Sequence, residues 1–165
     1  MSKKAGTWCL LSYRMPREPS SPRIAVWRKL KRLGVAQIGD GLVGLPSDAR
    51  TREHIDWIAQ EIEENGGTAL VWLAQPTSLS QERRLATEMS RARALEYRAV
   101  LNAATEGDTL TGGARTRLVR NLRAELRRIE RRDYFPPPER DQARLSVQYL
   151  AAADHDLKPI QEEHR

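Results

Sequence analysis

Short apolar runs alternate with helically spaced apolar positions along residues 1–74 of the chain. Four of the runs are too short for helices and are rich in branched or aromatic side chains, so they predict β-strands. They cover residues 8–13, 35–38, 42–45 and 69–73. The second and third runs are joined by Gly39-Asp40-Gly41, a sequence typical of a hairpin turn.

Two amphipathic helices are predicted between these strands. Ser21 is the expected N-cap of the first, with Gly34 at its end, and Thr51 the expected N-cap of the second. The expected buried stripes are Ile24, Trp27, Leu30 and Leu33 in the first helix, and Ile55, Ile58, Ala59 and Ile62 in the second. The order β-α-β-β-α-β predicts an α+β, ferredoxin-like domain over residues 1–76, an antiparallel sheet with both helices on one face.

The rest of the chain predicts an all-helical C-terminal extension over residues 77–153. A long helix opens at Ser78 or Ser80, and a second helix follows the glycines at 107, 112 and 113. The expected apolar stripes are Leu85, Met89, Ala92, Leu95 and Ala99 in the long helix, and Leu118, Leu122, Leu126 and Ile129 in the second. These helices should form an antiparallel hairpin, followed by a short helix over 139–153 and a frayed tail over 154–165.

Charge is distributed unevenly along the chain. The 28 basic and 22 acidic side chains give a net charge of +6. Residues 1–35 hold nine Lys or Arg against Glu18, and residues 115–132 hold eight arginines against Glu125 and Glu130. An acidic stretch, residues 51–65, separates them. Basic zones of this kind face a polyanion or an acidic protein surface.

Several classes of protein are disfavoured by composition. The sequence has no apolar run long enough to span a membrane, and its N-terminus lacks the apolar segment of a secretory signal. The single cysteine, Cys9, lies in a predicted buried strand and is interpreted as an inert core thiol in a reducing compartment, the cytoplasm. No metal-ligand cluster, cofactor loop or catalytic triad is evident, so we expect a protein that is not an enzyme.

Two sets of basic side chains are candidate contacts to nucleic-acid phosphates. The first set is Arg14, Arg17, Arg23, Arg28, Lys29, Lys31 and Arg32, and the second is Arg120, Arg123 and Arg127. Three interpretations of the first set stay open: phosphate contacts, pairing with the acidic second helix or an acidic partner protein, and a solvated surface without a role. The tryptophans Trp8, Trp27 and Trp72 are expected in the core, with Trp57 partly exposed.

Residues 13–34 carry two specific runs, Pro16-Arg17-Glu18-Pro19-Ser20 and the sequence VWRKLKRLG over residues 26–34. Thr51-Arg52-Glu53, residues 62–67 and Trp72 extend the pattern. In these runs the chain resembles the N-terminal domain of ChrB proteins, which accompany chromate-efflux transporters and are taken as chromate-responsive regulators of the resistance operon.

The resemblance implies a DNA-associated transcriptional regulator linked to chromate resistance, with chromate as a candidate effector for which the sequence indicates no site. The alternative is a non-enzymatic, dimeric protein-interaction module that binds an acidic partner. We expect a homodimer, because the second and fourth strands are short, apolar and placed to be edges of the sheet.

Overall fold

The computed structural model describes residues 5–153. These residues form two compact units, which divide between Met89 and Ser90. The described chain is of the α+β class, with one four-stranded antiparallel sheet and five α-helices.

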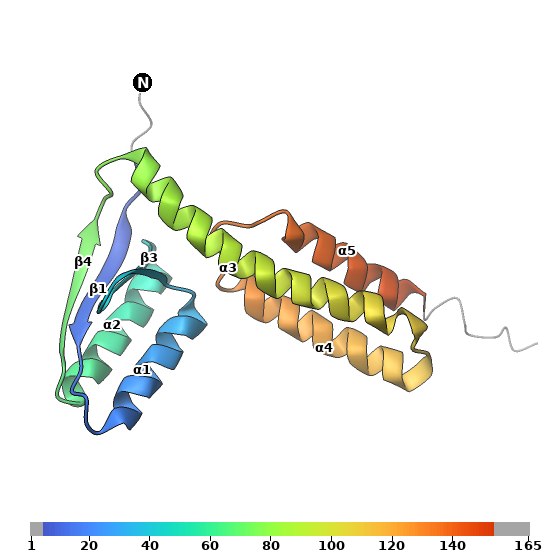
Figure 1. Cartoon of the computed structure of the whole chain (residues 1–165), viewed down its shortest axis with the longest axis horizontal. Helices are drawn as coiled ribbons and strands as arrows, with labels where there is room; N and C mark the ends of the chain where they lie inside the picture. The colour runs from blue at the N-terminus through green and yellow to red at the C-terminus, as the bar shows by residue number, and fades with distance from the viewer. Residues whose placement is uncertain (1–4, 154–165) are drawn as a thin grey trace, which may run out of the picture. The chain divides into compact units, whose positions relative to one another are not determined.

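The first unit confirms the predicted chain order β-α-β-β-α-β (Figure 1). Its elements are β1 (Trp8–Arg14), α1 (Ser20–Leu33), β2 (Ala36–Gly39), β3 (Leu42–Pro46), α2 (Ala49–Glu64) and β4 (Thr68–Ala74), followed by the start of α3 (Leu79–Glu106). The strands lie in the order β2-β3-β1-β4, each antiparallel to its neighbours. The two edges are therefore β2 and β4, and β3 separates the parallel strands β1 and β2.

The core of the first unit lies between the sheet and its two helices. Cys9 and Leu11 of β1 are fully buried, and α2 packs on β1 and β4. Both helices cover the same face of the sheet (Figure 1). The stripe predicted for α2 is confirmed, because Ile55, Ile58 and Ile62 are all buried.

The stripe predicted for α1 is wrong at two of its positions. Ile24 and Trp27 are 42% and 50% exposed, whereas Val26 and Leu30 are 0% and 2% exposed. Val26, Leu30 and Leu33 satisfy the same helical spacing as the predicted stripe, so periodicity alone could not choose between them. Val26 in the core turns the indole of Trp27 outward.

The predicted helix starts are also corrected. α1 begins after Pro19, which supplies no side-chain cap. α2 is capped by Asp48 rather than Thr51: the Asp48 carboxylate accepts from the Thr51 amide at 2.8 Å, and the Thr51 hydroxyl accepts from the Asp48 amide at 2.9 Å. Asp48 and Thr51 thus form a capping box in which Thr51 occupies the third helical position rather than the cap. Gly34 ends α1 as expected, in the left-handed conformation with φ of 74°.

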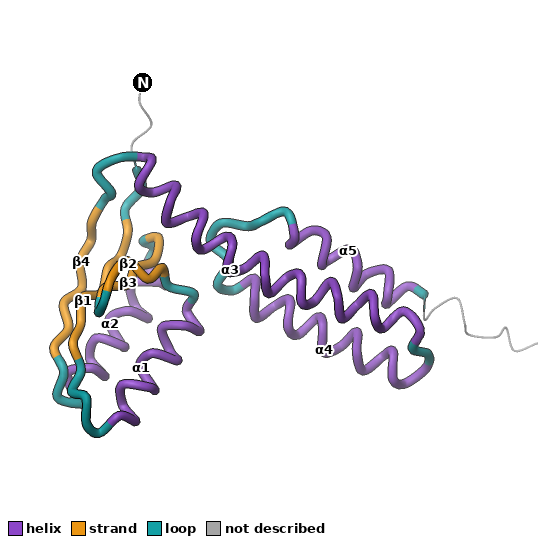
Figure 2. The backbone as a smooth tube through the Cα atoms, in the orientation of Figure 1, coloured by secondary structure: helices purple, strands orange, loops and turns teal. Residues whose placement is uncertain are grey.

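The second unit is a three-helix assembly. After Ser90, α3 continues to Glu106 and is followed by the 3-10 turn η1 (Gly107–Thr109), α4 (Gly112–Glu130) and α5 (Glu139–Ala152), as Figure 2 shows. The described chain after residue 77 is all-helical, as the sequence predicts. The predicted tail, residues 154–165, lies outside the described residues.

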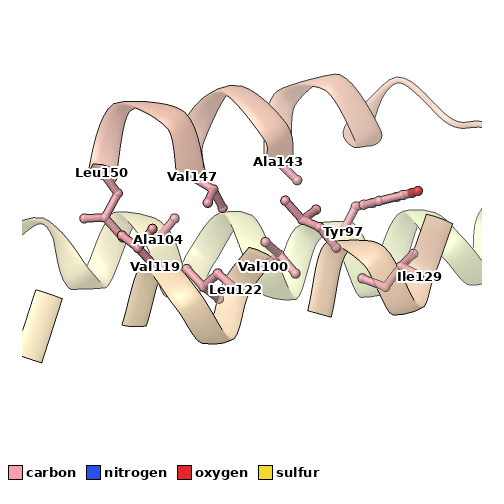
Figure 3. Packing of buried hydrophobic residues seen from close by; sticks show 10 residues of the cluster. Tyr97, Val100, Ala104, Val119, Leu122, Ile129, Ala143, Val147 and Leu150 are labelled. Atoms are coloured by element: carbon pink, nitrogen blue, oxygen red, sulfur yellow. The ribbon is translucent and has the colours of Figure 1, made fainter. Parts of the chain in front are cut away.

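One apolar cluster holds these three helices together (Figure 3). Its buried members are Tyr97, Val100, Ala104, Val119, Leu122, Leu126, Ile129, Ala143, Val147 and Leu150. The heptad stripe predicted for α3 is wrong after Met89, because Ala92 and Ala99 are exposed and Leu95 is 65% exposed. α3 has two neighbours in this unit, and the stripe through Tyr97, Val100 and Ala104 faces them instead.

A buried arginine fastens the turn between α3 and α4 to the end of α5. Arg115 is 3% exposed. Its guanidinium donates to the carbonyl of Leu150 at 2.8 Å, of Leu110 at 3.1 Å and of Asp108 at 3.2 Å. Backbone carbonyls from two separate segments thus satisfy one buried cation, since a buried charge without such partners is costly.

Replacing Arg115 with Ala should lower the free energy of unfolding by about 2–4 kcal/mol, because three carbonyls lose their donor and a cavity forms. Urea denaturation followed by circular dichroism measures the change. Arg117→Ala is the matched control, since Arg117 is exposed on the same helix, and should change stability by less than about 0.5 kcal/mol. An Arg115→Ala variant as stable as this control would show that the hydrogen bonds of the buried guanidinium do not stabilise the fold.

Candidate nucleic-acid interface

The first set of predicted basic residues lies on α1 and on the segment that leads into it. All seven side chains are exposed. Arg14 ends β1, Arg17 follows on the loop, and the other five lie along α1. The fold brings Arg14 together with Arg23 and Arg28 around one surface hollow. We call these seven residues the α1 surface.

Two lysines of the α1 surface are engaged within the first unit. Lys29 forms an ion pair with Glu61 of α2. The ammonium of Lys31 lies over the indole ring of Trp27, 4.3 Å from its centroid, a cation–π contact. Pairing between α1 and the acidic helix α2, one of the interpretations left open by the sequence, therefore accounts for Lys29.

The five arginines of the α1 surface differ from these lysines. Within residues 5–153, none of Arg14, Arg17, Arg23, Arg28 and Arg32 has a carboxylate oxygen within 4.0 Å. Their positive charge is consequently left for solvent or for an external anion.

The second predicted set lies on α4. Arg120, Arg123 and Arg127 are exposed on the side opposite the buried Leu122 and Leu126. Arg120 and Arg127 are seven positions apart, which spans about 10 Å along a helix. We call these three arginines the α4 surface.

The carboxylates near α4 are occupied by other arginines. Five ion pairs engage four of them: Glu96 with Arg93 and Arg132, Glu130 with Arg144, Glu125 with Arg128, and Glu139 with Arg98. In the described chain no such partner reaches the three arginines of the α4 surface. Three of these pairs, Glu96–Arg132, Glu130–Arg144 and Glu139–Arg98, join separate segments of the unit, and the α4 surface stays positive.

The prediction that most tryptophans are core residues is wrong for Trp27 and Trp72. Trp8 is buried at 2% exposure and its indole N–H donates to Glu82 at 3.1 Å. Trp72 is 51% exposed on edge strand β4, where its N–H donates to Ser12 at 3.1 Å. Trp57 is exposed, as predicted. Strand alternation places Trp72 on the sheet face that α1 and α2 do not cover, and the sequence pattern did not reveal which face that would be.

In the described part of the chain, His, Cys, Asp and Glu side chains form no group of three or more that could hold a metal ion. Cys9 is buried, and its desolvation, followed by the nearby Asp56, raises the pKa of the thiol. A thiol of this kind is held in its unreactive protonated form. Over residues 5–153, no helix combines the length and apolar character that crossing a membrane requires.

Five of the seven residues of the α1 surface, Arg23 to Arg32, lie within a stretch that matches a known family. The family model described as "Protein ChrB, N-terminal" matches residues 23–108, from α1 into η1. This span is more than half of the 165 residues. The chain belongs to the ChrB family.

One curated member of the ChrB family can be compared over most of the chain. Protein ChrB of Cupriavidus metallidurans is 28% identical over 167 residues, which cover 92% of this chain and 48% of that relative. The chain therefore spans about half the length of this curated ChrB protein. No solved structure matches the chain.

The Cys9 thiol should resist alkylation in the folded protein. Burial and the raised thiol pKa should make its reaction with iodoacetamide at pH 8 at least about a hundredfold slower than in 6 M urea, since only opened molecules react. Mass spectrometry of quenched time points measures both rates. Comparable rates in the two conditions would contradict the assignment of Cys9 as a core thiol.

Proposed function

We propose that the chain is a DNA-associated transcriptional regulator of the ChrB type, linked to chromate resistance. Membership of the ChrB family supports the link to that resistance system. The proposal places the chain in the cytoplasm, acting without catalysis, with DNA as its partner through phosphate contacts. Chromate is its proposed effector, without an assigned site.

The observation that carries the proposal is the unneutralised arginine on two helices. Arg23, Arg28 and Arg32 project from α1, and Arg120, Arg123 and Arg127 project from α4. Several acids of the two units pair with other cations, as Glu61 does with Lys29. Arginine on a helix face offers planar, multiple donors that suit phosphate oxygens. Contacts of this kind position a protein on DNA without selecting a base sequence.

We further propose that the first unit is a ferredoxin-like domain. The chain order β-α-β-β-α-β and the insertion of β3 between the parallel strands β1 and β2 support this classification. In such a domain both helices lie on one face of the sheet, and α1 presents its outer side to solvent.

Two triple variants test the DNA proposal. Arg23→Gln/Arg28→Gln/Arg32→Gln removes three charges from α1, and Arg120→Gln/Arg123→Gln/Arg127→Gln removes three from α4. Each should reduce the slope of log affinity against log salt by roughly one unit for every phosphate that is no longer neutralised, on any duplex sequence. Fluorescence anisotropy with a duplex carrying the operon promoter, titrated at several salt concentrations, measures the slope.

The matched control is Arg50→Gln/Arg83→Gln/Arg91→Gln. These three arginines are also exposed, and their removal changes the net charge by the same amount. The control should keep the slope of the wild type within about half a unit, because charges that do not touch the DNA release few counterions. If neither test variant differs from this control, the two surfaces do not bind DNA.

The alternative function is a dimeric protein-interaction module that binds an acidic partner. A specific observation favours an interaction surface: Leu70, Trp72 and Leu73 of edge strand β4 are 60%, 51% and 54% exposed. An unpaired apolar edge strand is a site at which another chain adds to the sheet. A homodimer through β4 is compatible with either function, and we propose it for both.

Light scattering at about 20 µM should therefore give twice the chain mass of 18.8 kDa. Leu70→Lys/Leu73→Lys should give the monomer mass, because charges on both faces of β4 oppose pairing of this edge. Leu95→Lys is the control, since Leu95 is exposed on a helix rather than on the sheet. A monomeric wild-type protein would refute the proposed dimer, and a dimeric double variant would place the interface elsewhere.

A further inference from the structure

The start of the α1 surface contains a hollow of about 460 Å³. Its walls come from three separate segments: the end of β1 with Tyr13 and Arg14, the first turns of α1, and the turn between β2 and β3 at Gly41. Pockets of this size that combine apolar walls with a few charged groups are typical of small-ligand sites. The hollow lies entirely within the first unit.

Three arginines line this hollow, and they are the chief charged groups around it. Arg14, Arg23 and Arg28 all contribute to the lining, and within the described residues none of them is paired with a carboxylate. Three arginines that line one hollow without a carboxylate partner can bind an anion with several oxygens, such as a phosphate group.

The apolar part of the lining includes an exposed aromatic ring. Trp27 is 50% exposed and lines the hollow together with Ile24. Ile24 and Arg23 lie one turn before Trp27, whereas Lys31 lies one turn after it and covers its ring at 4.3 Å. Lys31 is not part of the lining. The ammonium thus contacts the indole from outside the lining, and Trp27 itself borders the hollow.

The turn that closes the hollow is held by the backbone. The amide of Tyr13 donates to the carbonyl of Gly41 at 2.7 Å. Gly41 has a φ of +66°, and a Cβ at this position would lie 2.3 Å from the carbonyl oxygen of Tyr13. Only glycine permits this approach. The wall opposite α1 is thus fixed in place before any ligand binds.

We propose that this hollow binds a nucleotide whose base is unpaired, with the phosphate between Arg14, Arg23 and Arg28 and the base against Trp27. A bare oxyanion would leave most of the space empty, since 460 Å³ holds more than ten waters at about 30 Å³ each. A paired base inside a duplex does not expose its flat face. The ligand is therefore either a nucleotide within a single strand or a free nucleotide. The single-strand alternative rests on the proposed function, which is DNA binding.

The test uses the full chain, a labelled octathymidylate and a labelled duplex, with AMP and inorganic phosphate as competitors. Trp27→Leu should weaken octathymidylate binding about tenfold, because the base no longer stacks on an aromatic ring, and Trp27→Phe should restore most of it. Duplex binding should change by less than about twofold, since phosphate contacts dominate it. Trp57→Leu is the matched control, as Trp57 is 59% exposed on α2 outside the hollow, and should bind as the wild type does.

The competitors identify the source of the nucleotide. If AMP at micromolar concentration displaces the octathymidylate, the natural ligand of the hollow is a free nucleotide. If AMP does not displace it, the ligand is a nucleotide within a single strand. Displacement by inorganic phosphate as effective as that by AMP would overturn the role of the base. Equal octathymidylate binding by wild type and Trp27→Leu, or no binding of either octathymidylate or AMP, would overturn the proposal. In that case, retained duplex binding would still support the proposed function. Loss of duplex binding alone would refute the proposed function but would not bear on the nucleotide site in the hollow.

Discussion

The partners that the fold offers to each arginine side chain determine which arginines are buried or paired and which stay exposed. In the second unit, Arg115 is buried and satisfied by three backbone carbonyls. Other arginines of that unit pair with the carboxylates that join its helices, as Arg132 does with Glu96. A cation that leaves water must find such partners or stay at the surface. Several carboxylates are paired with basic side chains inside each unit, and within residues 5–153 the arginines of the α1 and α4 surfaces are among the exposed cations without such a partner.

The rotation of α1 about its axis couples the core of the first unit to its charged surface. Val26 and Leu30 are buried against the rest of the unit, so Trp27 and its basic neighbours must lie outside. A rotation that buried Trp27 would take the indole out of the hollow that Arg14 lines. Burial of Val26 and Leu30 in the core of the first unit therefore places the Trp27 ring beside unpaired arginines.

The sequence predicted the elements well and their orientation less well. Chain order, the buried stripe of α2 and the helical hairpin follow from short apolar runs and strong periodicity, which local spacing determines. The orientation of α1 did not follow, because Val26 and Trp27 are adjacent and each completes an apolar stripe. The predicted apolar stripe of α3 was wrong at Leu95, because the buried side of α3 is determined by the helices that pack on it and not by local spacing. The candidate arginines were identified from charge alone, whereas the hollow required the approach of β1, α1 and the turn at Gly41 in space.

In this ChrB family member, the arginines that the fold leaves unpaired are proposed to contact nucleic acid. A ¹H–¹⁵N spectrum of the arginine Nε–H groups, recorded during titration with a short promoter duplex at low salt, tests this proposal most directly. We expect shifts for Arg23 and Arg28 on α1 and for Arg120, Arg123 and Arg127 on α4, while the buried Arg115 stays unchanged. Unmoved resonances for all the exposed arginines of α1 and α4, at DNA concentrations that saturate the chain, would contradict it.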